Sequence, residues 1–287
     1  MQRTMRRLRS FLLAGAIAAC GAPAPVVGQA REARTSPSLF ARAPTATVSL
    51  PAALKEVSGL AVADGGRVLA HDDERAVVRE IDPASGAIVR SYAAGEELGD
   101  FEGIAAVGAD IYLIASNGRL LRLRAGDDGT RVPFEAFDTG LAGICEVEGL
   151  AYDKAGESLI VACKRMLARE MRETVTLYSW SVRTHRRSEA PWRALSERAL
   201  AAAAQVDEFH PSSVEIDART GRVILIAGRE GAMVELAPDG AILAGRRLGS
   251  GHYQAEGAAI LPDGALLIAD EAPKKGRAVL TRYARTP

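Results

Sequence analysis

The sequence predicts an all-β fold: a five-bladed β-propeller of four-stranded antiparallel blades, whose last blade is completed by the N-terminal strand. Three observations lead to this prediction. A short phrase, in which an acid or serine precedes a glycine or serine, recurs at a pitch of about 45 residues with one wider step. Short runs rich in Val, Ile and Leu follow each copy. The last copy is one strand short, and a spare strand precedes the first copy.

The recurring phrase marks the first strand of each expected blade. Its copies read EVSGLAV, DFEGIAA, EVEGLAY, HPSSVEI and QAEGAAI, and they align on Gly59, Gly103, Gly149, Ser213 and Gly257.

The first repeat shows the expected unit most clearly. It has strand-like runs at 56–62, 67–72, 76–82 and 87–93, separated by turn residues. Four strands in about 45 residues is the size of one propeller blade. We expect the segment at 46–51 to complete the fifth blade, because pairing the two ends of the chain removes two exposed sheet edges.

The wider step between the third and fourth copies carries an insertion near 182–209. Its composition favours a helix, with Trp192, Leu195, Ala199 and Leu200 on one face. We favour a helix that covers the edge of a blade over the alternative, a lid above a binding site.

The N-terminus has the pattern of an export signal. Basic residues precede an apolar run at 11–19 that is too short to span a bilayer, and Cys20 follows small residues as in a bacterial lipobox. The expected organisation is a signal peptide with lipobox at 1–20, a flexible tether at 21–45 and a propeller domain at 46–287.

The lipobox predicts where the protein resides. We expect lipid on Cys20 and attachment to the periplasmic face of the outer membrane. If Cys20 is not lipidated, the protein is expected to be soluble in the periplasm or secreted. Cys145 and Cys163 flank one predicted hairpin, and they either form a disulfide in that oxidising compartment or remain two small buried side chains.

Composition limits the classes of partner. The formal net charge is zero and aromatic residues make up 5% of the chain. A neutral surface argues against nucleic acid, because phosphate binding needs a basic one. We expect a monomer whose partner is the membrane, through its lipid, together with an unidentified protein or small molecule.

The residues that precede the aligned glycines point to a metal site. They are Ser58, Glu102, Glu148, Ser212 and Glu256. The first strand of each propeller blade lines the central channel, so the three carboxylates would repel one another unless a cation lies among them. Ca²⁺ fits best, because it prefers six to eight oxygen ligands. In the alternative interpretation these acids bond backbone amides of the next blade and only hold the ring together.

A second set lies two residues upstream, and strand alternation would place it on the same face. From this set we add Glu56, which compensates for the serine at 58. The predicted metal ligands are therefore Glu56, Glu102, Glu148 and Glu256. The contribution of Ser212 and Ser213 stays open.

Other polar residues suggest weaker possibilities. Acids at 71–74 and 270–271 end strands of neighbouring blades and could form a second cluster, although we favour ordinary turn chemistry for them. His210 and His252 precede two copies of the phrase, where either could act as a general base.

The phrases EVSGLAV…LAHDDE…VVREID, EGLAYD…LIVACKR and AEGAAILPDGALLIADE resemble the SdiA-regulated (YjiK-like) family over residues 46–285. The resemblance implies a five-bladed β-propeller with a bound calcium ion, distantly related to NHL-repeat propellers. It implies no established reaction, although some six-bladed relatives are metal-dependent hydrolases and a phytase-like family is another neighbour.

Three functions remain in view, and one of them is a purely structural envelope protein whose glutamates only tie blade to blade. Another is a cell-envelope lipoprotein whose calcium-binding propeller acts as a binding or scaffold module, and we favour it because the sequence lacks a complete catalytic constellation. The alternative is a calcium-dependent hydrolase, acting as a lactonase, esterase or phytase-like phosphoesterase, with its site in the central channel.

Overall fold

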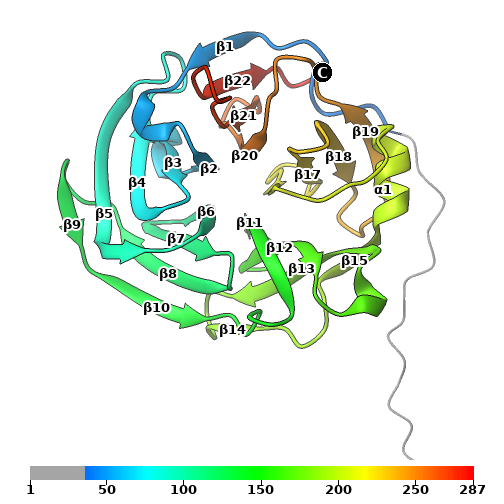
Figure 1. Ribbon diagram of the computed structural model, residues 1–287, viewed down its shortest axis with the longest axis horizontal. Helices are drawn as coiled ribbons and strands as arrows, with labels where there is room; N and C mark the ends of the chain where they lie inside the picture. Colours follow the sequence, from blue (N-terminus) through cyan, green and yellow to red (C-terminus); the bar gives the residue numbers. More distant parts are fainter. Residues whose placement is uncertain (1–35) are drawn as a thin grey trace, which may run out of the picture.

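The computed structural model describes residues 36–287, and its strands form five sheets around a central axis (Figure 1). This confirms the predicted five-bladed propeller. The predicted signal peptide, its Cys20 and the first part of the predicted tether lie outside the described residues. Within residues 36–287, no helix is long and apolar enough to cross a membrane.

Each blade is built from strands that follow one another along the chain, from the axis outward. Blade 1 contains β2 (Val57–Val62), β3 (Val68–Asp72), β4 (Arg75–Ile81), β5 (Ile88–Leu98) and the added β9 (Thr130–Val132). Blade 2 contains β6 (Phe101–Val107), β7 (Asp110–Ala115), β8 (Arg119–Arg124) and β10 (Phe134–Asp138). Blade 3 contains β11 (Cys145–Asp153), β12 (Ser158–Met166), β13 (Thr174–Ser181), β14 (Arg186–Arg187) and β15 (Arg193–Ser196).

The remaining blades follow the same plan. Blade 4 contains β16 (Ser213–Ile216), β17 (Val223–Ala227), β18 (Ala232–Leu236) and β19 (Ile242–Arg247). Blade 5 contains β20 (Ala255–Ile260), β21 (Leu266–Asp270), β22 (Val279–Tyr283) and β1 (Ala46–Ser49). The helical segments are α1 (Glu197–Ala204) and the short 3-10 turns η1 (Ala52–Leu54), η2 (Asp64–Gly66) and η3 (Arg169–Met171).

The innermost strands close a ring. β2 contacts β6, β6 contacts β11, β11 contacts β16, β16 contacts β20, and β20 returns to β2. The glycine of the recurring phrase permits this close approach. A Cβ added at Gly103 would lie 2.7 Å from the backbone nitrogen of Leu150 in the next blade, and one at Gly257 would lie 3.0 Å from that of Leu60. The glycine at Gly103, Gly149 and Gly257 therefore recurs because each of these inner strands packs against the backbone of the next blade.

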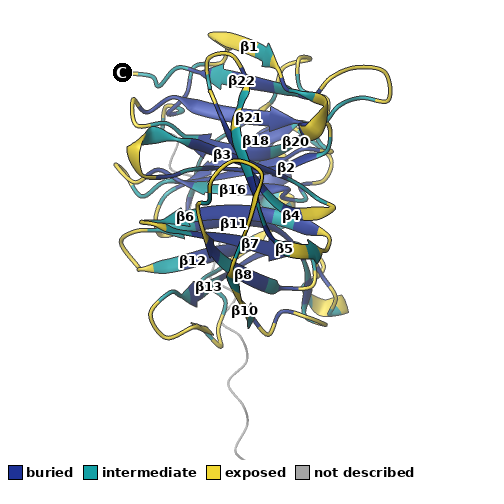
Figure 2. Cartoon of the chain, turned by 90° about the vertical axis from the view of Figure 1, so that its left-hand side faces the viewer, coloured by how far each residue is buried: buried dark blue, intermediate teal, exposed yellow. Residues whose placement is uncertain are grey.

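The apolar core is divided among the blades. Five clusters of buried side chains fill the spaces between adjacent blades, including the space between blades 5 and 1. Figure 2 shows the buried strands stacked through the molecule, with exposed residues mainly in the loops and outer strands. Burial of these apolar faces is the main stabilising contribution to the ring.

The predicted closing strand is confirmed. β1 pairs antiparallel with β22, from Ala46 opposite Arg282 to Ser49 opposite Val279. The preceding residues also pack on the propeller, although we expected a flexible tether up to residue 45. Leu39 and Phe40 are buried, and the backbone N–H of Leu39 donates to the carboxylate of Glu235.

Two features of the outer strands differ from the expected plan. β9 pairs in parallel with β5, so a loop of blade 2 extends the sheet of blade 1. The fourth strand of blade 3 is divided in two, because β14 and β15 pair with different parts of β13.

The insertion contains one helix, α1, which lies on β19 and covers the outer edge of blade 4 (Figure 1). Leu200 is buried in the cluster between blades 3 and 4. Only Ala199 and Leu200 of the predicted helix face belong to the helix, because Leu195 lies in β15 and Trp192 precedes that strand. Both of those residues nevertheless pack against the same cluster.

Candidate metal centre

A break in the pairing register marks the residue before the glycine in four blades. The register between the first and second strands skips Ser58, Glu102, Glu148 and Glu256. Such a β-bulge leaves one residue unpaired and re-aims its side chain. The same four side chains were singled out by the repeat, and the bulges explain how each one leaves the sheet for the channel.

The three glutamates come from three blades, and the charge of Glu148 contributes to the raised pKa of the other two. Burial, followed by the charges of Glu148 and Asp100, raises the pKa of Glu102 to about 9. Burial and the charge of Glu148 raise the pKa of Glu256 to about 8. Glu148 is 5% exposed, and burial is the largest cause of its raised pKa. The carboxylates thus share an electrostatic environment that disfavours their negative charge.

One lysine lies among these acids. Lys164, on β12, places its Nζ 2.5 Å from Glu148 Oε1. Burial alone would lower the pKa of Lys164, but the charges of Glu148 and Glu256 outweigh burial and raise it. The raised pKa of Lys164 therefore indicates that negative charge is in excess around this lysine.

A second acidic cluster lies at the mouth, where blades 1 and 5 meet. Burial and the charges of Asp73 and Glu56 raise the pKa of Glu271 to about 7. Burial and Glu56 also raise the pKa of Asp73. Gln254 Nε2 donates to Glu271 Oε2 at 2.9 Å. The turn chemistry that we favoured for these acids is also present, because the Arg75 N–H donates to Asp72 Oδ1 at 3.3 Å.

Glu56 belongs to the mouth cluster rather than to the inner three glutamates. Its side chain is 41% exposed and lies 3.0 Å from Lys55 Nζ. The bulge at Ser58 interrupts the strand alternation on which we had placed Glu56 and Glu102 at neighbouring depths. Ser58 instead donates a hydrogen bond of 3.0 Å to Glu102 Oε2.

Blade 4 has no acid at the equivalent position, and its serines bond backbone groups. Ser212 Oγ donates to the carbonyl of Ala255 at 2.7 Å and accepts from the N–H of Gly228 at 3.0 Å. Ser213 Oγ accepts from the N–H of Ala258 at 3.1 Å. Here the alternative interpretation, ties between blades, describes the geometry.

The histidines differ in accessibility. The His252 side chain is 3% exposed, with Nδ1 2.7 Å from Asp270 Oδ2 and Nε2 2.6 Å from the Tyr283 hydroxyl. His71 is fully buried, which lowers its pKa to about 4. His252 is therefore shielded from any ligand in the channel, whereas His210 is partly exposed.

A cavity of about 660 Å³ opens beside the mouth cluster. Its lining includes Glu56, Glu271 and Gln254, together with Tyr253, whose exposed ring borders the opening. Lys274 also lines it. This size suits a small molecule, and the lining combines carboxylates, cations and an aromatic ring.

Sequence reasoning missed Lys164 and undervalued Glu271. Neither belongs to the recurring phrase, since Lys164 lies on the second strand of blade 3 and Glu271 follows the second strand of blade 5. Their position along the chain could have identified them. Both lie near the end of the second strand of a blade, and in an antiparallel pair that end lies beside the start of the first strand.

Two solved structures have similar folds. Glutaminyl cyclase of Myxococcus xanthus superposes with a TM-score of 0.57 at 12% identity, covering 85% of this chain and 97% of that one. The PQQ-bound form of aldose sugar dehydrogenase of Streptomyces coelicolor gives 0.56 at 15% identity, covering 86% and 98%. At these identities the likeness concerns the fold alone.

The sequence also matches a family model. The model described as SdiA-regulated covers residues 42–275, which is more than half of the chain. No curated protein matches the sequence.

Proposed function

The chain belongs to the SdiA-regulated family, and from that premise we propose that it is a cell-envelope lipoprotein with Ca²⁺ in its channel. In this proposal the propeller acts as a monomeric binding or scaffold module without a nucleic-acid partner. Its faces engage an unidentified protein or small molecule, and lipid on Cys20 attaches it to the outer membrane.

One observation carries the cation proposal: four carboxylates with raised pKa values share one electrostatic environment, in which Lys164 pairs with Glu148. The carboxylates belong to Glu102, Glu148, Glu256 and Glu271. A divalent cation would neutralise the excess charge and return these groups to their ionised forms. The donors are all oxygens, which Ca²⁺ prefers, whereas Zn²⁺ favours nitrogen and sulfur.

The spacing of the acids determines how the ion would be held. Within residues 36–287, one group of three or more possible ligands has all its ligand atoms within 4.8 Å, and it does not include the channel glutamates. Ca²⁺ accepts water among its ligands and tolerates loose geometry. We therefore expect direct contact with Glu148 and one neighbour, and water bridges to the others.

The cation proposal is tested by metal analysis and by thermal unfolding with and without a chelator. Calcium at 100 times its dissociation constant should stabilise the fold by about 2.7 kcal/mol. Protein purified with calcium that holds none, and that melts at the same temperature in chelator, would contradict it.

The disulfide between Cys145 and Cys163 supports export, because such bonds persist in oxidising compartments. Fractionation of cells that express the Cys20→Ala variant tests the anchor. We expect the wild-type chain in the outer membrane and the variant in the soluble periplasmic fraction. A wild-type chain that is already soluble would exclude the lipid.

A calcium-dependent hydrolase is the second candidate, and the cavity at the channel mouth favours it. Glu271 lines that cavity, and its pKa of about 7 suits a general acid or base near neutral pH. Calcium in the channel would polarise a substrate oxygen and position water. Glutaminyl cyclase and aldose sugar dehydrogenase, whose folds are similar, are enzymes by name, which is a reason to test this chain for activity.

A panel of lactones, aryl esters and phytate separates the two candidates. A hydrolase should lose activity in chelator, in Glu148→Gln and in Glu271→Gln, while Glu146→Gln, which removes a half-buried acid paired with Arg165, serves as the control. Activity that ignores calcium and survives both changes would exclude this site, and no activity at all would favour the binding protein.

A further inference from the structure

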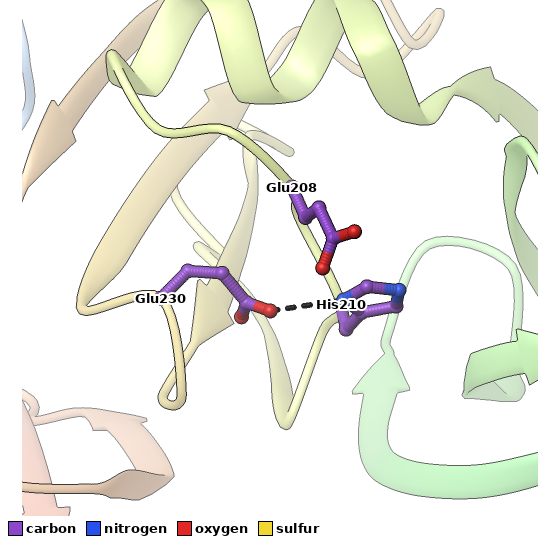
Figure 3. Close-up of side chains that lie close together, drawn as sticks. All are labelled: Glu208, His210 and Glu230. Atoms are coloured by element: carbon purple, nitrogen blue, oxygen red, sulfur yellow. Dashed lines mark hydrogen bonds and ion pairs between the residues drawn. The ribbon is translucent and has the colours of Figure 1, made fainter.

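A second group of metal-ligating side chains lies on blade 4, apart from the channel glutamates. Glu208 and His210 belong to the loop between α1 and β16, and Glu230 lies in the turn between β17 and β18 (Figure 3). One possible ligand atom from each of the three lies within 4.8 Å of the others. Blade 4 thus carries a candidate site of its own.

The loop is built to present Glu208 and His210 together. Phe209, between them, is fully buried, and its backbone N–H donates to Glu197 Oε1 at 2.6 Å. In extended chain, residues on either side of a buried residue point the opposite way. Pro211 holds His210 in extended backbone, because the residue before proline disfavours the helical region. The helix therefore anchors the loop that carries both ligands.

Glu230 supplies the observation that points to a ligand. Its side chain is 9% exposed, and its Oε1 lies 2.9 Å from His210 Nδ1. Its other oxygen, Oε2, is buried without a hydrogen-bond partner. Figure 3 shows the Glu230 carboxylate directed toward His210, with Glu208 approaching from another side. A buried carboxylate oxygen without a partner is unfavourable unless a proton or cation satisfies it.

We propose that Glu208, His210 and Glu230 bind one divalent transition-metal ion, with Zn²⁺ as the reference. One imidazole nitrogen with two carboxylates suits such an ion, whereas Ca²⁺ prefers oxygen alone. Three protein ligands leave one position of a tetrahedron open. Because Glu208 is exposed, that position faces solvent and accepts water or a small ligand.

Titration calorimetry of the full chain tests the site, after metals are removed with a chelator. We expect one equivalent of Zn²⁺ to bind the wild-type chain. His210→Ala and Glu230→Gln should weaken binding at least tenfold, and Glu208→Gln should weaken it less. Glu208 is exposed, so that variant keeps the test valid if either of the others fails to fold.

Two control variants locate the ion. Glu189→Gln removes an exposed acid that lies outside the group, and Glu148→Gln removes a channel acid. Both should bind Zn²⁺ as the wild-type chain does. A wild-type chain that binds no Zn²⁺ would overturn the proposal. So would binding that survives all three blade 4 substitutions, or binding that is lost in Glu148→Gln alone.

Discussion

Blades 3 and 4 use the same strand position for different purposes. In blade 3 a bulge releases Glu148 from the ladder, and Lys164 from the neighbouring strand reaches its carboxylate. In blade 4 the ladder begins one residue later, at Ser213, and the equivalent Ser212 bonds the backbone of Gly228 and Ala255. The first arrangement concentrates charge in the channel, and the second joins two blades.

This difference shows that the residue type, together with the local backbone, decides what a repeated position does. An unpaired residue in a bulge is free to aim a charged side chain at the axis. In blade 4 the short hydroxyl of Ser212 instead satisfies buried backbone groups. Blade 1 lies between these cases, because Ser58 occupies a bulge but donates to Glu102.

The largest effect expected from this comparison is the loss of calcium stabilisation in Glu148→Gln. A neutral amide removes the most buried of the three channel carboxylates, so most of the gain of about 2.7 kcal/mol at saturating calcium should disappear. The control is Glu146→Gln, which removes an acid that pairs with the exposed Arg165. Thermal unfolding across a calcium series measures both, and equal calcium responses would contradict the proposed site.

Ser212→Ala should lower the stability of the fold rather than its affinity for calcium. It leaves the Gly228 N–H and the Ala255 carbonyl without their partner, which costs about 1–3 kcal/mol in a buried position. Calcium affinity should not change. The matched variant Ser58→Ala should alter calcium affinity through Glu102 with less loss of stability. Chemical denaturation measures the stability difference, and an unaffected Ser212→Ala would show that this tie is dispensable.

The channel acids also predict how stability varies with pH. Without calcium, the folded chain keeps protons on Glu102 and Glu256 up to pKa values of about 9 and 8, while the unfolded chain releases them near 4.5. The folded state therefore binds more protons in this window, and stability falls as pH rises through it. Calcium should oppose the fall, because it binds the ionised carboxylates. Melting temperatures from pH 5 to pH 9, with and without chelator, measure this, and a chelated protein that gains stability with pH would contradict it.

The smallest expected effect is a gain. The ammonium group of Lys164 pairs with Glu148 and would compete with a bound cation. Lys164→Gln should therefore raise calcium affinity about three- to tenfold, or about 0.7–1.4 kcal/mol. Arg165→Gln is the neighbouring control, since Arg165 is exposed and pairs with Glu146. Calorimetric titration compares the two, and a lower affinity in Lys164→Gln would mean that the lysine helps to hold the site together.

The repeat predicted the fold because its pitch and its glycines are direct consequences of ring packing. Glycine occupies position 103 because a side chain there would collide with Leu150 of the next blade. The closing strand was also predictable, since the fifth repeat lacked one strand and β1 was spare. These properties depend on sequence periodicity and on sheet edges, which are visible in a single chain.

The details of the site were less predictable for a physical reason. A bulge is a property of pairing between two strands, so strand alternation alone placed Glu56 too near Glu102. Lys164 and Glu271 reach the channel from second strands, and no motif joins them to the phrase. Whether calcium and lipid are present stays a prediction.

The pairing of β1 with β22 has a consequence for biosynthesis. β1 is made near the start of the chain, yet its partner, Val279–Tyr283, is among the last residues to be made. A chain truncated before Val279 cannot complete blade 5, whatever the state of the other four. Closure of the toroid thus depends on both ends of the propeller: a chain that lacks β22 leaves blade 5 open and stays exposed to proteolysis.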